Sequence, residues 1–447
     1  MVNLWYLAYL IIIICYIQYA FSGLFNIPIV NKIVPQIDDS LIIVFLFLII
    51  FGRIKRGIYS ISKNHFNLFV LILTALFIIS ATVNHVSLFV FFLSFKSYFV
   101  YVAFFYCITQ LQYNAPRINR FLRIIFWCFF LQLPILAIQF LIALENGTLN
   151  DDTGFGTFPD ANNLSYSVFF PLVFVTYLYF VQGQKAYKWH FWLLLLVLVL
   201  PVGEFAIVGY FFIFIFLLST NFLRSKKAFK RIFYIVVPML IVIFAFSFFK
   251  MSKSYNGRSI FATINPVFLF SWITHTQNEV SGGAQRNLYF PLTYVNLMKY
   301  SRSPWIGFGP GMYASNIAFQ LMPATNNLVY DAFNQTKYGM DPDVDSQIIP
   351  IWGEFGYAGV IVFLGFIIFC FFYFYIEYRH ARDMQLKAFS FVSMTGTVFL
   401  LFGFYVAHVW ETQTVFGTLM MFYGLFYLRR KEIRAQVSSG VKQREII

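Results

Sequence analysis

The chain has 447 residues, of which 60% are hydrophobic and only 11% are charged. Soluble globular domains carry about 25% charged residues, so this composition excludes a soluble domain. The formal net charge of +14 does not indicate a nucleic-acid-binding protein, because the cations lie in short loops between apolar runs, as they do in membrane proteins next to anionic lipid.

The apolar runs are long enough for helices that cross a hydrocarbon core of about 30 Å. We therefore predict an all-α polytopic membrane protein with about twelve transmembrane helices. The first run is interpreted as a retained span, because Met1-Val2-Asn3-Leu4 contains no basic segment typical of a signal peptide. The predicted spans are 4–24, 40–52, 66–83, 88–111, 120–144, 161–182, 188–202, 204–222, 231–249, 348–376, 387–407 and 411–428.

Every second loop, together with the C-terminal tail, is rich in lysine and arginine. The intervening loops are poor in cations, and residues 145–160 instead carry four acidic residues. By the positive-inside rule, both termini are predicted to be cytoplasmic and residues 250–347 to lie outside. The cation-rich segments are 52–65, 112–123, 183–188, 223–231, 377–387 and 429–447.

This topology divides the chain into four parts. Residues 1–249 hold spans one to nine, and 250–347 form a large extracytoplasmic loop with short helices. Residues 348–428 hold spans ten to twelve, and 429–447 form a basic cytoplasmic tail. The cysteines all lie within apolar runs without ligand-like spacing, so we predict no metal site and no cofactor. They are Cys15, Cys107, Cys128 and Cys370.

A helix is predicted in the outer loop from Asn287 to Arg302. Apolar residues recur there at Leu288, Leu292, Val295 and Met298, close to the helical period.

Arg286 would stand at the N-terminus of this helix. Free backbone N–H groups and the positive end of the helix dipole favour an anion at that place. A guanidinium adds a planar fork that suits phosphate oxygens. The alternative is an arginine that pairs with a carboxylate of the loop.

Three further features of the outer loop are candidates for a site. The glycines of segment 307–311 permit a tight turn or the close approach of a ligand, and a plain turn is the simpler interpretation. Asp345 precedes span ten, where it can cap the helix or act as a general base. Glu354 lies about two turns into the span, where a carboxyl group is costly and often functional unless it is shallow enough to reach water.

Four segments, in this order, resemble the O-antigen polymerase and O-antigen ligase superfamily of bacterial surface-polysaccharide enzymes. They are the Gly-Phe-Gly-Thr-Phe-Pro-Asp-Ala-Asn-Asn run of 154–163, Arg286 leading a helix of the outer loop, the Pro-Trp-Ile-Gly-Phe-Gly-Pro-Gly run of 304–311, and Asp345-Ser346-Gln347 followed by 353–359. Ligases of this superfamily usually have a histidine–asparagine pair where this chain has Asp345-Ser346, which favours a polymerase.

The resemblance implies a metal-independent, inverting glycosyl transfer at the outer face of the bacterial inner membrane. The donor would be a glycan on undecaprenyl pyrophosphate, and the acceptor a hydroxyl of a second lipid-linked repeat unit. The product would be O-antigen, capsule or exopolysaccharide. The expected partners are these lipid-linked glycans and the bilayer, with a chain-length regulator as a further candidate and no nucleic acid.

Roles for single residues also follow from the resemblance. Arg286 would stabilise the leaving pyrophosphate, with help from Arg258, Lys299 and Arg302. Asp345 would accept the hydroxyl proton. The secondary candidates are Glu354, His408, Asn162 and Asn163.

Two alternatives remain open at this point. An O-antigen ligase would move the finished glycan to an acceptor such as lipid A core. A lipid-linked oligosaccharide flippase would also have about twelve spans, but it should carry ionisable residues along a central pathway. The spans here are nearly free of charge, with Lys96 as the main exception.

Overall fold

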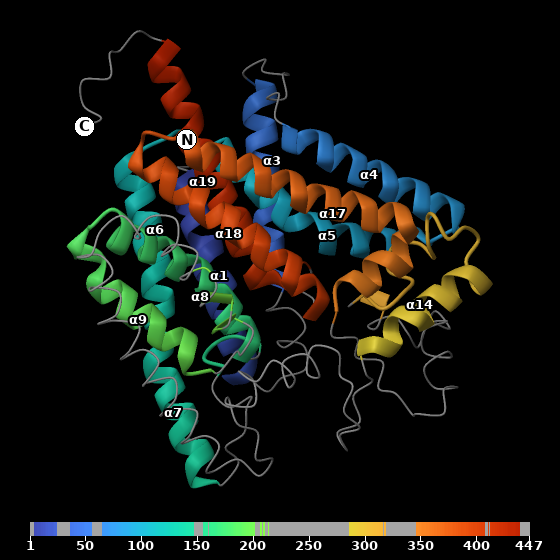
Figure 1. The fold of residues 1–447 in the computed structure, drawn as a ribbon, viewed down its shortest axis with the longest axis horizontal. Coiled ribbons are helices and arrows are strands. Elements are labelled where there is room, and N and C mark those ends of the chain that lie inside the picture. The colour runs from blue at the N-terminus through green and yellow to red at the C-terminus, as the bar shows by residue number, and fades with distance from the viewer. Residues whose placement is uncertain are drawn as a thin grey trace.

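The computed structural model describes residues 4–24, 36–55, 65–146, 155–159, 161–201, 286–315, 317–318, 346–406, 410 and 412–438, together with a few positions between 206 and 213. All regular structure in these residues is helical (Figure 1). The helices are α1 (Leu4–Leu24), α3 (Ile37–Lys55), α4 (His65–Val83), α5 (Leu88–Thr109), α6 (Ala115–Phe130), α7 (Gln132–Glu145), α8 (Ala161–Thr176), α9 (Lys188–Val199), α14 (Arg286–Tyr300), α17 (Ile348–His380), α18 (Met384–Val406) and α19 (Gln413–Ser438), with short helical turns at Tyr177–Val181 and Lys185–Tyr187.

Six segments in the described part are long and apolar enough to cross a membrane. They are Phe66–Val83, Leu88–Thr109, Ala115–Glu145, Ala161–Val181, Ile348–His380 and Met384–Gly403. A helix satisfies all of its internal backbone hydrogen bonds, which is what a chain in hydrocarbon requires. The all-α membrane class is therefore confirmed. The predicted span 231–249 lies outside the described residues, and 204–222 is described only at a few positions.

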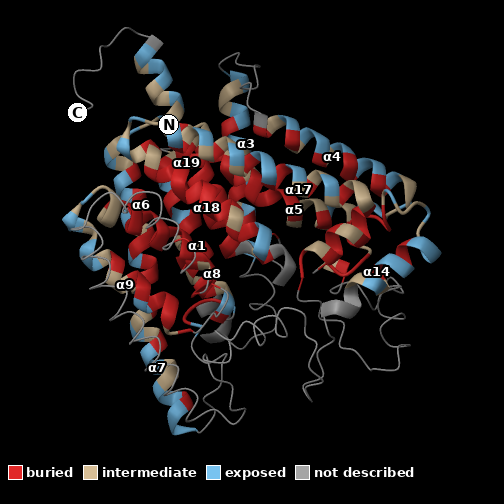
Figure 2. Cartoon of the chain, viewed as in Figure 1, coloured by how far each residue is buried: buried red, intermediate tan, exposed pale blue. Residues whose placement is uncertain are grey.

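The bundle has a buried centre and an exposed apolar rim (Figure 2). In α8 and α18, 83% and 78% of the span is buried, whereas in α4 and α17 the values are 39% and 33%. The rim exposes large apolar side chains such as Phe47 and Leu71. Apolar side chains facing outward are expected where lipid, rather than water, is the solvent.

Close helix approach in the centre depends on glycines of α19. A Cβ at Gly417 would lie 2.8 Å from the Tyr101 ring, and a Cβ at Gly424 would lie 2.8 Å from the Ile108 side chain. Helices in membranes gain their association energy from such tight packing between small residues and neighbouring side chains. These two glycines therefore set the α5–α19 contact.

At one end of the bundle, α1 and the ends of α3 and α5 meet, at the described borders of the cation-rich segments 52–65 and 112–123. The indole of Trp5 donates to the carbonyl of Gln112 at 3.2 Å, and Arg53 donates to Gln110 at 2.7 Å. At the other end, the residues that follow α14 contact the turn between α4 and α5. We call these the cation-rich end and the α14 end.

Candidate functional site

The α14 end of the bundle is built on a break in α17. Gly356 interrupts this helix with φ 62° and ψ −157°, a conformation that only glycine adopts without strain. Around it the sequence reads Gly353-Glu354-Phe355-Gly356-Tyr357-Ala358-Gly359. The break turns backbone groups of α17 outward, so they are free to bond with another segment.

Residues 304–309 form backbone hydrogen bonds with the N–H and C=O groups around this break. Phe308 N donates to Gly353 O at 2.9 Å and Gly309 N to Glu354 O at 3.0 Å. In the opposite direction, the amides of Tyr357 and Ala358 each donate at 3.1 Å, to the carbonyls of Pro304 and Trp305 respectively. These four backbone hydrogen bonds fix the segment to α17.

Glycine is required in this loop for space as well as for conformation. Gly307 has φ 69°, and a Cβ there would lie 2.4 Å from Gly353 O. Gly309 has φ 104°, and a Cβ there would lie 2.5 Å from the Val86 side chain. The glycine run, which was predicted to form a turn, therefore packs directly against α17 and the α4–α5 turn.

Two side chains attach the same loop to α4. The hydroxyl of Ser80 lies 2.7 Å from Ile306 O and 3.0 Å from Glu354 O, so it bridges the loop and α17. Arg302 donates from Nη1 to Val83 O at 2.7 Å. Neither Ser80 nor this use of Arg302 follows from the sequence, because the partners are backbone carbonyls far along the chain.

The carboxyl group of Glu354 is fully buried beneath the loop. Tyr98 Oη and Tyr313 N each donate to it at 3.4 Å. Glu354 is thus enclosed by protein rather than shallow enough to reach water, and its carboxyl group links α17 to Tyr98 of α5 and to the backbone of Tyr313.

α14 packs on α17 through the side chain of Tyr313. The Tyr313 hydroxyl donates to Thr293 Oγ1 and accepts from Asn296 Nδ2, each at 3.2 Å. Its ring stacks on Phe308 with centroids 5.1 Å apart. Arg286 is the first residue of α14, as predicted. Lys299, near the end of the helix, lies over the Tyr300 ring at 4.9 Å.

The remaining candidates divide into two groups. Arg258, Asp345 and His408 lie outside the described residues. Asn162 and Asn163 begin α8, the former exposed and the latter half-buried. They follow the turn at 155–159, which is separate from the loop at 304–309 that packs on α17.

That second turn is held by amide side chains of α7. Gln139 and Gly156 exchange two hydrogen bonds, of 2.8 and 2.9 Å. Thr157 N donates to Gln132 Oε1 at 2.8 Å, and Thr157 Oγ1 donates to Tyr16 O at 2.5 Å. Gly156 and Thr157 are therefore held between α1 and α7.

A buried ionic cluster, which was not among the predicted sites, lies at the start of α3. Asp38 and Asp39 are both buried in the first turn of α3. Lys96 lies 2.7 Å from Asp39 Oδ2, and Tyr101 Oη donates to Asp38 at 2.6 Å. Lys96 was the one feature of the sequence that pointed to this cluster, because a cation within an apolar span requires a partner.

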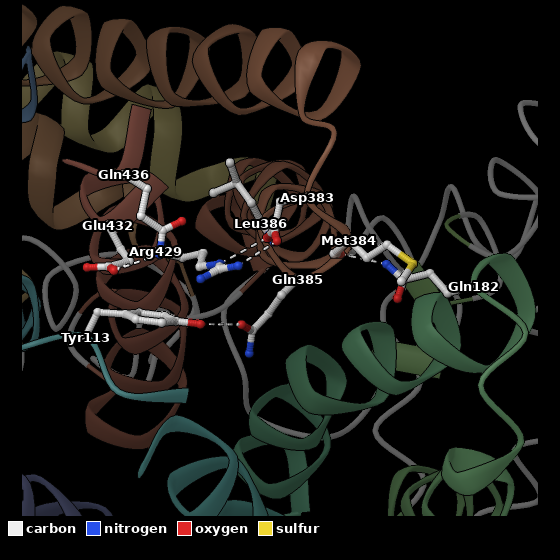
Figure 3. Close-up of polar contacts among 9 residues, drawn as sticks. All are labelled: Tyr113, Gln182, Asp383, Met384, Gln385, Leu386, Arg429, Glu432 and Gln436. Atoms are coloured by element: carbon white, nitrogen blue, oxygen red, sulfur yellow. Dashed lines mark hydrogen bonds and ion pairs between the residues drawn. The ribbon is translucent and has the colours of Figure 1, made fainter. Parts of the chain in front are cut away.

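The cation-rich end has a polar cluster of its own (Figure 3). Arg429 forms a two-pronged ion pair with Asp383, at 3.1 and 2.6 Å, and its guanidinium lies 4.7 Å from the centre of the Tyr113 ring. Gln182 donates to Met384 O at 2.6 Å. Tyr113, Gln182, Asp383 and Arg429 come from four separate cation-rich segments or their borders, so the cluster joins the loops at this end.

Burial by itself would raise the pKa of Asp383. Hydrogen bonds from Arg429 and from the amides of Leu386 and Gln385, together with the Arg429 charge, outweigh burial and hold this pKa below its usual value. Burial raises the pKa of Tyr113, although Arg429 opposes the shift. At neutral pH Asp383 is therefore ionised, and its pairing with Arg429 stabilises the fold.

The fold and this distribution of groups define a multi-pass helical membrane protein with an ordered helix–loop unit on one end. No protein-family model matches the chain, and a search of curated proteins finds no similar sequence. Among the described residues, no three His, Cys, Asp or Glu side chains gather in a way that could hold a metal ion.

Proposed function

We propose that this chain is a polysaccharide polymerase of the bacterial inner membrane. In this proposal it has about twelve spans, both termini are cytoplasmic, and residues 250–347 face outward between spans nine and ten. The reaction joins lipid-linked repeat units into O-antigen, capsule or exopolysaccharide.

One observation supports this proposal above the others. The helix that begins with Arg286 is attached rigidly to the end of α17, through Tyr313 and through the paired segment 304–309. Arg302 lies at the same end, bonded to the α4–α5 turn. Cations would thus stand where helices end at a bilayer surface, which is where the pyrophosphate of a lipid carrier resides.

The proposed transfer moves one glycan between two lipid carriers. A hydroxyl oxygen of the acceptor repeat unit forms a bond to the anomeric carbon of the donor glycan. The bond from that carbon to the pyrophosphate oxygen breaks, and undecaprenyl pyrophosphate leaves with the electron pair. The hydroxyl proton passes to Asp345, the proposed base.

Positive charge next to the leaving oxygen lowers the barrier of such a step. We assign this role to Arg286, with Arg258, Lys299 and Arg302 as supporting cations. Glu354 is assigned a positioning role rather than that of a base, because it is enclosed beneath the loop.

Deletion of the gene and complementation with single variants tests this function. We expect Arg286→Ala to insert normally but to leave lipid carriers bearing one repeat unit, seen as loss of the polysaccharide ladder on a gel. Lys431→Ala, in the exposed tail, is the control and should restore the ladder. A normal ladder with Arg286→Ala would contradict the proposal.

The same experiment separates the alternatives. A ligase variant would leave long chains on the carrier lipid, and a flippase variant would leave single units on the cytoplasmic face. Asp345→Asn distinguishes a base from a helix cap, because asparagine caps a helix about as well as aspartate but cannot accept the proton. We expect Asp345→Asn to be inactive.

A further inference from the structure

The outward side of α14 is apolar, whereas its protein-facing side carries polar side chains among the apolar Phe290, Leu292 and Leu297. Toward the protein it presents Thr293 and Asn296, which are 0% and 4% exposed and bond to Tyr313. Leu297 is buried beside them. A surface helix in water normally buries its apolar stripe and exposes its polar one.

The outward face of α14 carries an apolar stripe at helical spacing. Pro291, Tyr294, Val295 and Met298 are all exposed, the last three by 48%, 51% and 48%. These positions are separated by three, one and three residues, so they share one face of the helix. Exposing this stripe to water would be unfavourable, because the free-energy cost rises with the apolar area in contact with water.

The chemistry around the stripe is that of a membrane interface. Tyr294 and Tyr300 are half exposed, and Trp305 is 62% exposed just beyond the helix. Tyrosine and tryptophan concentrate where headgroups meet hydrocarbon. Lys299 is exposed at the end of the helix, and a cation there complements anionic lipid phosphates.

The loop after α14 connects this helix to the apolar rim of the spans. The loop that follows α14 packs on the first turns of α5, where a Cβ at Gly311 would lie 2.8 Å from Val90. On the same turns, Leu88, Phe89 and Phe92 are exposed by 64% or more. Through this loop, α14 is attached beside the outward apolar surface of a helix that is itself long and apolar enough to span the bilayer.

We infer that α14 is an interfacial lipid anchor, with Pro291, Tyr294, Val295 and Met298 in the acyl-chain boundary and Lys299 at the anionic headgroups. Interfacial helices of this kind lie in the plane of the membrane, about 5–10 Å into the headgroup and acyl boundary. The anchor needs only a bilayer, so it stands whether or not the chain makes polysaccharide.

Spin labels on the full-length chain test this inference. Val295→Cys and Met298→Cys would each carry a nitroxide, in nanodiscs of phosphatidylcholine and phosphatidylglycerol. The native cysteines are buried, and the unsubstituted chain gives the labelling background. Leu71→Cys, on the exposed face of α4, is the lipid reference, and Lys431→Cys, in the exposed tail, is the water reference.

The measurement is the ratio of collision rates with oxygen and with a water-soluble nickel chelate. Oxygen concentrates in hydrocarbon and the chelate in water, so we expect ratios at 295 and 298 several-fold above that at 431 and close to that at 71. Ratios equal to that at 431 would show a water-facing helix and overturn the inference. Low collision rates with both reagents would show that protein covers the stripe, which would also overturn it.

Discussion

Gly356 and Pro304 are in direct backbone contact, so that a Cβ at Gly356 would lie 2.2 Å from the Pro304 carbonyl oxygen. This contact sits at the centre of the four hydrogen bonds between α17 and segment 304–309. The position of α14 depends on it, because the same segment connects α14 to the bundle.

Gly356→Ala should therefore weaken the fold and detach the loop. The new methyl group meets backbone, which cannot move aside as a side chain can, and φ 62° is strained for alanine. We expect a loss of about 2–4 kcal/mol from the clash and the backbone strain together, measured as a lower Tm in detergent micelles.

Gly365→Ala is the matched control on the same helix. A Cβ at Gly365 would have no heavy atom within 4 Å, and alanine favours a helix by up to about 1 kcal/mol over glycine. Its Tm should be unchanged or higher. Equal Tm values for the two variants would show that the contact between segment 304–309 and α17 does not contribute to stability.

Tyr313→Phe should loosen α14 without disturbing the rest of the bundle. Removal of the hydroxyl leaves Thr293 and Asn296 buried without this partner, at a cost of about 1–3 kcal/mol. Limited proteolysis should then cut more rapidly near α14. Tyr294→Phe, on the exposed face, is the control and should change the cleavage rate little; equal rates in the two variants would contradict the assignment.

Lys96→Met should destabilise the start of α3. Asp39 is buried and loses the cation that lies 2.7 Å away, and an unpaired buried charge costs on the order of 3 kcal/mol. The double variant with Asp39→Asn should recover most of the loss. A double-mutant cycle with no coupling between the two sites would exclude a stabilising pair.

The Asp383–Arg429 pair should make stability depend on acid pH. The pKa of Asp383 is lowered in the folded chain, so its stabilisation is present above the unfolded pKa of about 3.9 and is lost as the pH falls through the lower, folded value. Wild type should exceed Asp383→Asn by about 1–2 kcal/mol at pH 7, and this difference should shrink as the pH falls below about 3.9.

Melting curves of both proteins across pH 3 to 7 measure this difference. Leu386 N and Arg429 both bond to Asp383, so the variant keeps an acceptor and should still fold. A gap between the two proteins that stays constant down to pH 3 would show that the ionised carboxylate is not what stabilises the cluster.

The sequence alone determined the membrane class, because runs of about twenty apolar residues have few other stable environments. It also placed a helix after Arg286 from period alone, and α14 begins at that residue. The alternation of cations put Tyr113, Asp383 and Arg429 in segments of one predicted group, and these three side chains lie together. These are local or compositional properties, and a single sequence carries them.

Only the tertiary structure decided which face of α14 turns inward. It alone also showed that Glu354 lies enclosed beneath segment 304–309. Val295 and Met298 mark the helical period in the sequence, yet they point away from the protein, while Thr293 and Asn296 face Tyr313. The physical reason is that periodicity shows that a helix has two faces, but not which solvent, lipid or protein, each face meets. Likewise, the partners of Ser80 and Gly356 are backbone carbonyls, which every residue possesses and no sequence pattern marks.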